Sequence, residues 1–146
     1  MRLTIRTNLA MRALMFCAVH RGRMVRKHEI AAACNASENH LGVVVNMLGQ
    51  AGFIETARGR NGGIKLARAP ETLSVGEVFR LFEATVPFAE CFAAADNHCP
   101  LTCACRLKGT LARAVEAFYA ALDDVTLADL VNNNAELVEL LSLERA

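Results

Sequence analysis

Four of the six cysteines in this chain lie in one short segment, "ECFAAADNHCPLTCACRLKG" at 90–109. They are Cys91, Cys99, Cys103 and Cys105, and their spacing is Cys-x7-Cys-x3-Cys-x-Cys. Thiols gathered in this way serve disulfide chemistry, structural zinc binding or iron–sulfur cluster binding. Structural zinc sites use cysteine pairs with two to four intervening residues, which only Cys99 and Cys103 satisfy.

Iron–sulfur clusters accept thiolates from less regular loops, so the irregular spacing suits them better. His98 offers a nitrogen donor to either metal centre. A switch that forms reversible disulfides is a third use of the same thiols. Spacing alone leaves these three interpretations comparable.

The expected cellular compartment and the sequence motifs reduce the number of possible uses of these cysteines. Arg2, Arg6 and Arg12 interrupt any secretory signal near the start, and no run approaches the roughly 18 apolar residues of a membrane span. We therefore expect a cytoplasmic protein with no membrane partner, in which clustered cysteines more often bind metal or do redox chemistry than form stable disulfides. We find no phosphate-binding glycine loop and no nucleophile with a base, so we do not expect an enzyme.

Charge divides the chain into two unlike halves. Residues 1–70 hold 11 Lys and Arg against 3 Asp and Glu, a net charge of +8, and residues 71–146 hold 5 against 12, a net charge of −7. Their sum is the +1 of the whole chain. A basic half favours a polyanionic partner, whereas an acidic half would be repelled by one.

The basic half has the pattern of a helix-turn-helix. Apolar spacing predicts helices over 8–20 and about 26–34, with Asn35 in the left-handed conformation of a tight turn. Ser37 is a good N-cap for a third helix that ends at Gly49–Gly52. Two helices joined by a short polar turn indicate DNA recognition, although an ordinary polar helix face would have the same pattern.

A β-hairpin is predicted directly after the third helix. Strands at 53–56 and 64–66 flank "RGRNGG", in which Asn61 and Gly62 are a strong turn pair. A basic hairpin in this position is typical of a wing that contacts DNA. The expected DNA-contacting residues are Ser37, Asn39, His40, Val43 and Asn46 of the third helix, and Arg58, Arg60, Asn61 and Lys65 of the wing.

The acidic half contains more helices. We predict helices over 74–84, from about 107 to 124, after a Thr126–Asp129 capping box, and in the tail. The long helix has one apolar stripe and little else in the chain to cover it, so a second copy is its expected partner. Cys17 and Cys34 fall on apolar helix faces and are expected to be core residues.

Taken together, these residues resemble the Rrf-type iron–sulfur winged-helix repressors, and most of all their nitric-oxide-sensing branch. The resemblance covers nearly the whole chain and rests on "LTIRTNLAMRAL", "SENHL", "GFIETARGRNGGIKLA" and "CPLTCACRLKGTLARAVEAFYAALDDVTLADLV". It implies a homodimer joined through the long helix that binds a palindromic operator in double-stranded DNA. It also implies that nitric oxide, the effector, nitrosylates the cluster and ends DNA binding.

The resemblance also assigns the cysteines. Cys91, Cys99 and Cys105 match the three cluster ligands of the family, and Cys103 is an additional thiol. Some nitric-oxide sensors of the family take a fourth ligand, an aspartate, from the first helix of the other subunit, where this chain has Asn8. The candidates for the fourth ligand here are therefore Asn8, His98, water and a small thiol. Three cysteines with one variable ligand favour [4Fe-4S], with [2Fe-2S] as the alternative. The x7 gap and Asn8 also occur in the iron-responsive branch of the family, whereas "NHL" and "TLADLV" favour the nitric oxide branch.

The sequence therefore predicts a mainly α fold with a small β-hairpin wing, built as a winged helix-turn-helix plus a long dimerisation helix. The expected divisions are a DNA-binding domain at 1–86, a cluster-binding loop at 87–106, and a dimerisation helix with C-terminal helices at 107–146. The predicted function is a repressor that senses nitric oxide through an iron–sulfur cluster. The alternatives are an iron-responsive repressor and a zinc-stabilised adaptor that binds protein.

Overall fold

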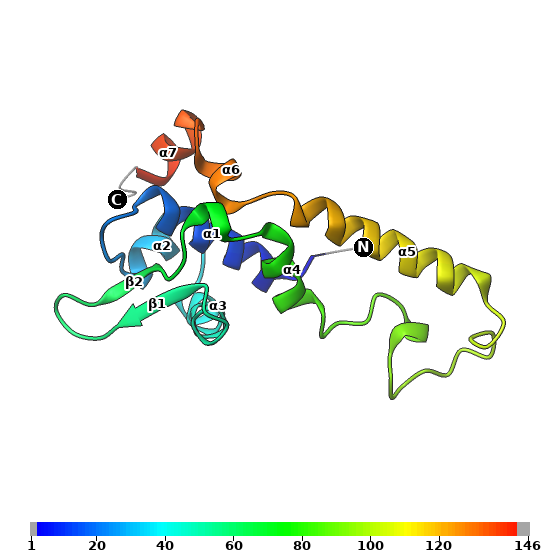
Figure 1. Ribbon diagram of the computed structural model, residues 1–146. Coiled ribbons are helices and arrows are strands. Elements are labelled where there is room, and N and C mark those ends of the chain that lie inside the picture. Colours follow the sequence, from blue (N-terminus) through cyan, green and yellow to red (C-terminus); the bar gives the residue numbers. More distant parts are fainter. Residues whose placement is uncertain (1–2, 143–146) are drawn as a thin grey trace.

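The computed structural model describes residues 3–142 and has two parts, a compact helical body and a long helix that projects from it (Figure 1). The helices are α1 (Ile5–Val19), α2 (Lys27–Ala33), α3 (Glu38–Gln50), α4 (Val75–Glu83), α5 (Arg106–Asp123), α6 (Leu127–Val131) and α7 (Ala135–Ser142). Two 3-10 turns, η1 (Pro70–Thr72) and η2 (Glu90–Phe92), and two strands, β1 (Ile54–Ala57) and β2 (Gly63–Leu66), complete it. The predicted fold class, mainly α with a β-hairpin wing, is confirmed.

Helix α1 is the centre of the body. It begins three residues earlier than the apolar pattern predicted, because Thr4 caps it by accepting a hydrogen bond from the Thr7 backbone. Its side chains are buried on several sides, with Ala10 and Leu14 fully covered. Helices α3, α4, α6 and strand β2 all pack on it, so α1 holds the parts of the body together.

The helix-turn-helix forms as expected. Asn35 adopts the predicted left-handed conformation with φ of 50° between α2 and α3. Leu41, Val44 and Leu48 of α3 are buried against α1, which leaves the opposite face of α3 to solvent. Ser37 stands at the N-cap position of α3, but within residues 3–142 its side chain makes no capping hydrogen bond.

The wing differs from the prediction at its turn. Strands β1 and β2 pair antiparallel, with Ala57 opposite Gly63, so the five residues 58–62 form the loop, two fewer than the seven between the predicted strands at 53–56 and 64–66. The turn is closed by a 3.1 Å hydrogen bond from the Gly62 amide to the Gly59 carbonyl, which makes Arg60 and Asn61 its central residues. Gly62 is needed for another reason: a Cβ built there would lie 2.2 Å from the Ala57 carbonyl oxygen.

The C-terminal segments return to the body. Leu127 and Val131 of α6 are in the core and α7 packs on α1 and α2, so residues 107–146 contain both an outer helix and two helices of the body. The predicted capping box between Thr126 and Asp129 is present. No helix among residues 3–142 is both long and apolar enough to span a membrane.

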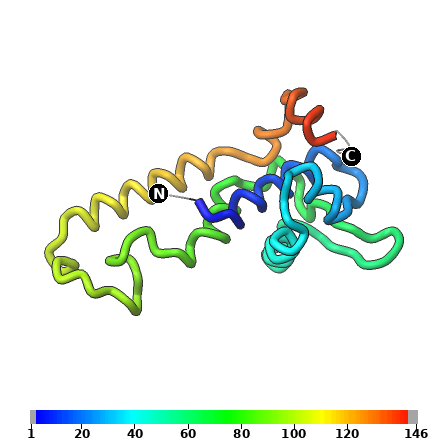
Figure 2. The backbone as a smooth tube through the Cα atoms, turned by 180° about the vertical axis from the view of Figure 1, so that it is seen from behind, coloured from blue at the N-terminus to red at the C-terminus, as the bar shows by residue number. Residues whose placement is uncertain are grey.

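Helix α5 runs outward from the body, as both views show (Figures 1 and 2). The C-terminal part of α5 contacts the body through α4: Phe118 packs near Phe79, and Arg80 forms an ion pair with Asp123. Within the described residues, no side chain of α5 is buried, and Leu107 is 61% exposed. The apolar stripe predicted for this helix is therefore only partly covered in one chain: Leu107 is exposed, whereas Phe118 and Leu122 are partly buried against the body.

The close approach of α4 to α5 predicts a strict requirement for glycine at position 76. A Cβ built on Gly76 would lie 1.9 Å from the Asp123 side chain and 2.9 Å from its backbone nitrogen. We expect Gly76→Ala to cost about 1–3 kcal/mol in the free energy of unfolding, because the two helices must separate. Urea unfolding followed by circular dichroism measures this cost.

A matched control exists in α3. A Cβ built on Gly49 meets no described heavy atom within 4 Å, so Gly49→Ala should stabilise the helix by about 0.5–1 kcal/mol. Equal stability of Gly76→Ala and the parent protein would contradict the described contact between α4 and α5.

Candidate nucleic-acid interface and cysteine loop

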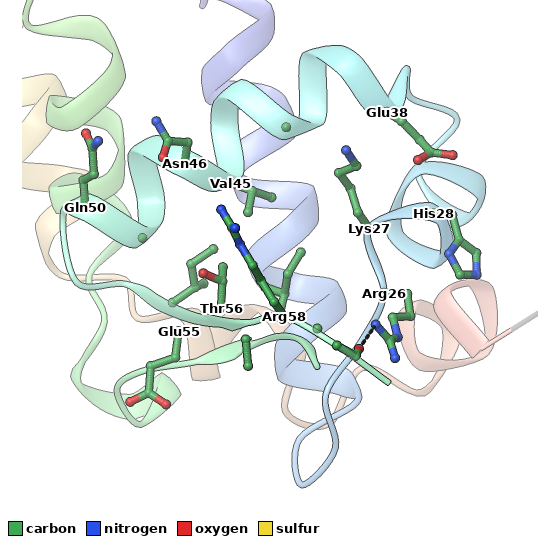
Figure 3. A pocket seen from close by; sticks show the side chains of 17 residues that line it. Arg26, Lys27, His28, Glu38, Val45, Asn46, Gln50, Glu55, Thr56 and Arg58 are labelled. Atoms are coloured by element: carbon green, nitrogen blue, oxygen red, sulfur yellow. Dashed lines mark hydrogen bonds between the residues drawn. The ribbon is translucent and has the colours of Figure 1, made fainter. Parts of the chain in front are cut away.

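A cleft of about 1010 Å³ separates α3 from the wing (Figure 3). Its walls are the exposed face of α3, the residues at the start of α2, and strand β1 with the hairpin loop. Asn46 lies on the α3 wall, and Arg58 extends from the hairpin toward α3. The cleft is thus bordered by two elements that the sequence predicted to contact DNA.

All of the predicted DNA-contacting side chains are exposed. They are Ser37, Asn39, His40, Val43, Asn46, Arg58, Arg60, Asn61 and Lys65. Lys65 forms an exposed ion pair with Glu55 at 3.3 Å, whose contribution to stability is small. The structure therefore leaves these side chains accessible, and their contacts with DNA remain a prediction.

Two cations at the start of α2 were missed by the sequence analysis. The amine of Lys27 is directed toward α3, 3.7 Å from a Cβ built on Gly42 (Figure 3). The guanidinium of Arg26 donates to the backbone carbonyls of Gly59, at 3.0 Å, and Arg60. Residues so far apart in sequence give no periodic pattern, so only the folded structure relates them.

Glu29 fixes the backbone from which Arg26 extends. Its carboxylate accepts a 2.6 Å hydrogen bond from the Arg26 amide and pairs with Arg23 at 3.0 Å. Partial burial alone would raise the pKa of Glu29, but the hydrogen bonds from Arg23 and Arg26 outweigh it and hold the pKa below its usual range. The carboxylate therefore stays ionised, and keeps both partners, at neutral pH.

The cysteine segment forms a loop at the far end of α5 (Figure 2). Its own hydrogen bonds shape it: Glu90 accepts from the His98 amide at 2.7 Å, and Asn97 accepts from the Cys99 amide at 3.1 Å. The Glu90 contact closes the loop between Cys91 and Cys99. Where the loop begins, an apolar hollow of about 360 Å³ separates residues 86–92 from the α5 residues Phe118 and Tyr119.

The loop thiols are accessible but not yet gathered. Cys91, Cys99 and Cys105 are partly exposed and Cys103 is exposed, and none of these four is in a disulfide within the described chain. Across residues 3–142, no three His, Cys, Asp or Glu side chains are arranged to hold a metal ion. Asn8, one of the candidates for the fourth ligand, is exposed on α1. The donor chemistry fits an iron–sulfur cluster, and binding one requires the loop to close around it.

Cys17 and Cys34 are buried, as the sequence predicted. Burial, and secondarily the nearby Cys34, raise the pKa of the Cys17 thiol to about 12. A thiol with this pKa carries almost no thiolate at neutral pH, so Cys17 is a core residue and is unsuited to bind metal.

A hydrogen-bonded cluster connects the start of α1 to the end of α4. One carboxylate oxygen of Glu83 accepts from the Thr4 amide at 2.8 Å, from the Thr4 hydroxyl at 3.0 Å, and from the hydroxyl of the fully buried Thr7. The cysteine loop follows α4 directly in the chain. Glu83 therefore ties the entrance of that loop to α1, which supports α3.

Comparison with known proteins relates the whole chain to one group of regulators. Residues 3–133 match the Rrf2 family, described as "Iron-dependent Transcriptional regulator". The chain is 46% identical over 146 residues to the HTH-type transcriptional regulator NsrR of Geobacillus kaustophilus, covering 99% of each protein. It is 41% identical to the protein of the same name in Bacillus subtilis, again covering 99% of each.

Solved structures agree on the fold. The oxidized form of Staphylococcus aureus CymR matches with a TM-score of 0.70 and 25% identity, over 90% of this chain and 97% of that one. T. potens IscR matches with a TM-score of 0.72 over 100% of this chain and 94% of that one. Its identity of 24% supports the shared architecture alone.

The cleft predicts two kinds of DNA-binding defect. Arg60→Ala should weaken binding to every duplex and reduce the slope of log affinity against log salt by about one, because a phosphate contact is lost. His40→Ala should instead change which duplex is preferred, because its side chain is exposed at the start of α3, where base edges are read. Fluorescence anisotropy over a series of salt concentrations measures both effects. An unchanged salt slope in Arg60→Ala would exclude the wing tip from phosphate contact.

Proposed function

Because the chain belongs to the Rrf2 family of transcriptional regulators, we propose that it is a DNA-binding repressor that senses nitric oxide through an iron–sulfur cluster. The single observation that carries the proposal is the place of the cysteine loop. The loop lies between α4, which is tied to the body that carries α3, and α5, whose apolar stripe is only partly covered within one chain. Regulation of transcription also decides against the alternative of a protein-binding adaptor, and against an enzyme.

The proposed cluster ligands are Cys91, Cys99 and Cys105, with Asn8 of a second subunit as the fourth. Thiolates are the ligands that such clusters require, and the accessibility of these three suits a loop that takes up a cofactor. The bound group would supply an iron centre to which nitric oxide binds. The hydrogen bond from the His98 amide to Glu90 spans the segment between Cys91 and Cys99, which supports a loop that could bring these two thiols to one cluster.

A homodimer joined through α5 is part of the same proposal. The exposed Leu107 side chain and the half-buried Leu111 and Val115 are apolar surface that one chain leaves in water. Association of two such helices would bury that surface with C2 symmetry, and a palindromic operator has the matching symmetry. The two recognition helices then dock only if their separation equals about one turn of DNA, roughly 34–36 Å.

Two sets of hydrogen bonds would transmit a change in the cysteine loop to the proposed DNA-binding face. Glu83 fastens α4 to the first turn of α1 through Thr4 and Thr7, and Arg80 fastens α4 to α5 through Asp123. A change in the conformation of the loop therefore acts on two attached helices, α4 and α5. The proposed readout is a change in the spacing of the two α3 helices in the dimer.

An iron-responsive repressor is the second candidate. It is favoured by the description of the family as iron-dependent. A neutral amide such as Asn8 is a weaker ligand to iron than a carboxylate, which is consistent with either candidate. Both candidates need a labile fourth ligand, so the ligand set alone does not distinguish them. The relatives named NsrR and the resemblance to the nitric-oxide-sensing branch favour the first candidate.

The ligand assignment predicts an asymmetric cysteine series. Cys91→Ala, Cys99→Ala and Cys105→Ala should each abolish the cluster, whereas Cys103→Ala should retain it, because Cys103 is the additional thiol. The cluster content of each variant is measured after anaerobic purification by analysis of iron and sulfide and by visible absorption. A colourless Cys103→Ala protein together with a brown Cys91→Ala protein would reverse the assignment.

The effector is identified by comparing how readily nitric oxide and an iron chelator each release the protein from its operator. A few equivalents of nitric oxide per cluster should release the anaerobic protein from its operator before a modest excess of iron chelator does. Asn8→Asp should slow the chelator-driven loss, because a carboxylate holds iron more firmly than an amide. Gel shifts against each agent measure the release. Release by the chelator with continued binding under nitric oxide would replace the first candidate by the second.

A further inference from the structure

Two neighbouring cations at the start of α2 have different partners. Arg26 is half-buried, and its guanidinium makes two hydrogen bonds to the carbonyls of Gly59 and Arg60 at the tip of the wing. Lys27 is exposed and is directed into the cleft toward α3. The dashed line from Arg26 in Figure 3 marks the contact with the wing. Of these two adjacent cations, Arg26 thus binds the wing, whereas Lys27 extends into the cleft.

The backbone that carries Arg26 is fixed before its side chain reaches the wing. Val25 and Ile64 exchange two backbone hydrogen bonds, at 2.8 and 2.7 Å, which join the start of α2 to strand β2. Glu29 holds the Arg26 amide at 2.6 Å. Because these bonds fix the start of α2 against β2, the guanidinium extends toward the wing tip from an ordered support.

The tip itself has little other support. All residues of the hairpin loop except Gly62 are exposed, and Gly59 has φ of +96°. Loops of this kind are mobile unless they are tied to a scaffold. The planar guanidinium presents several donors in a fixed geometry, so one side chain can hold two successive carbonyls.

We propose that Arg26 is a positioning residue for DNA binding, which holds the wing tip at a set distance from α3 through these two carbonyls instead of contacting phosphate. The proposal rests on the role of the wing in DNA binding. Arg58, which extends from the held loop toward α3, is thereby aimed before DNA arrives. A pre-ordered tip avoids the entropy cost of ordering it on binding, so loss of Arg26 weakens binding through the wing.

The first test needs no DNA. Hydrogen exchange on the full-length protein compares Arg26→Met with Lys27→Met, which remove the same charge at neighbouring positions. We expect the Gly62 amide, which donates to the Gly59 carbonyl, to exchange about tenfold faster in Arg26→Met and at the parent rate in Lys27→Met. Parent-like exchange in Arg26→Met, or equally fast exchange in both variants, overturns the proposal. Because this readout is independent of DNA, it stands even if the proposed function fails.

The second test asks whether Arg26 acts through the wing. We expect Arg26→Met to bind duplex DNA about tenfold more weakly than the parent, and to have no added effect when Arg58 and Arg60 are already alanine. Lys27→Met should weaken binding equally in both backgrounds. Full additivity of Arg26→Met with the wing changes would show a direct phosphate contact and overturn the proposal.

Arg26→Lys separates charge from geometry. Lysine keeps the positive charge but cannot span two carbonyls as a planar fork, so this variant should exchange and bind like Arg26→Met. Parent-like DNA binding by Arg26→Lys would show that only the charge matters. The thermal midpoint, measured for every variant, should stay near that of the parent, because the contact is confined to the surface.

Discussion

The arrangement of every functional element depends on the burial of α1. Its side chains pack against α3, α4, α6 and β2 at once, and Ala10 and Leu14 are fully covered. A fully buried leucine contributes on the order of 1.5–3 kcal/mol relative to an exposed one, so such a helix has little freedom to shift alone. Because α3 and α4 are both seated on it, the DNA face and the entrance to the cysteine loop share one rigid support.

The features that depend on a local sequence pattern, such as the apolar spacing of a helix, a turn residue or a capping pair, could be predicted from the sequence. The apolar spacing of Leu41, Val44 and Leu48 located α3, and Asn35 and the Thr126–Asp129 pair located a turn and a cap. Contacts between residues far apart in sequence could not be found in this way. The Arg26 contact with the wing, the Glu83 contact with Thr7 and the approach of Gly76 to Asp123 have no periodicity, because they depend on how finished elements meet. The wing turn was misplaced for a related reason: the Asn61–Gly62 pair indicates a local turn, but backbone crowding by Ala57 determines where glycine is required.

In the folded chain, the basic and acidic halves of the sequence meet in ion pairs. Arg68 of the basic half pairs with Glu77 of the acidic half at 2.9 Å, and Arg21 lies 3.7 Å from Glu71. Hydrogen bonds from Arg68, the largest influence on Glu77, hold the pKa of that carboxyl below its usual range. These pairs are exposed and contribute little stability, but they place carboxylates over cations that lie away from the cleft. Lys27 and Arg58 form no ion pair with a carboxylate among residues 3–142, and both border the cleft.

The contact that holds the wing tip uses only main-chain oxygens of the tip, those of Gly59 and Arg60. Every amino acid supplies the same carbonyl, so the attachment does not depend on which side chains the tip carries. Glycine is confined to Gly59 and Gly62, where conformation and crowding demand it. Arg60 and Asn61 can therefore be exchanged in the course of evolution while the hairpin keeps its place. A lineage can in this way change how strongly the wing tip attracts DNA phosphates without rebuilding the scaffold that presents it.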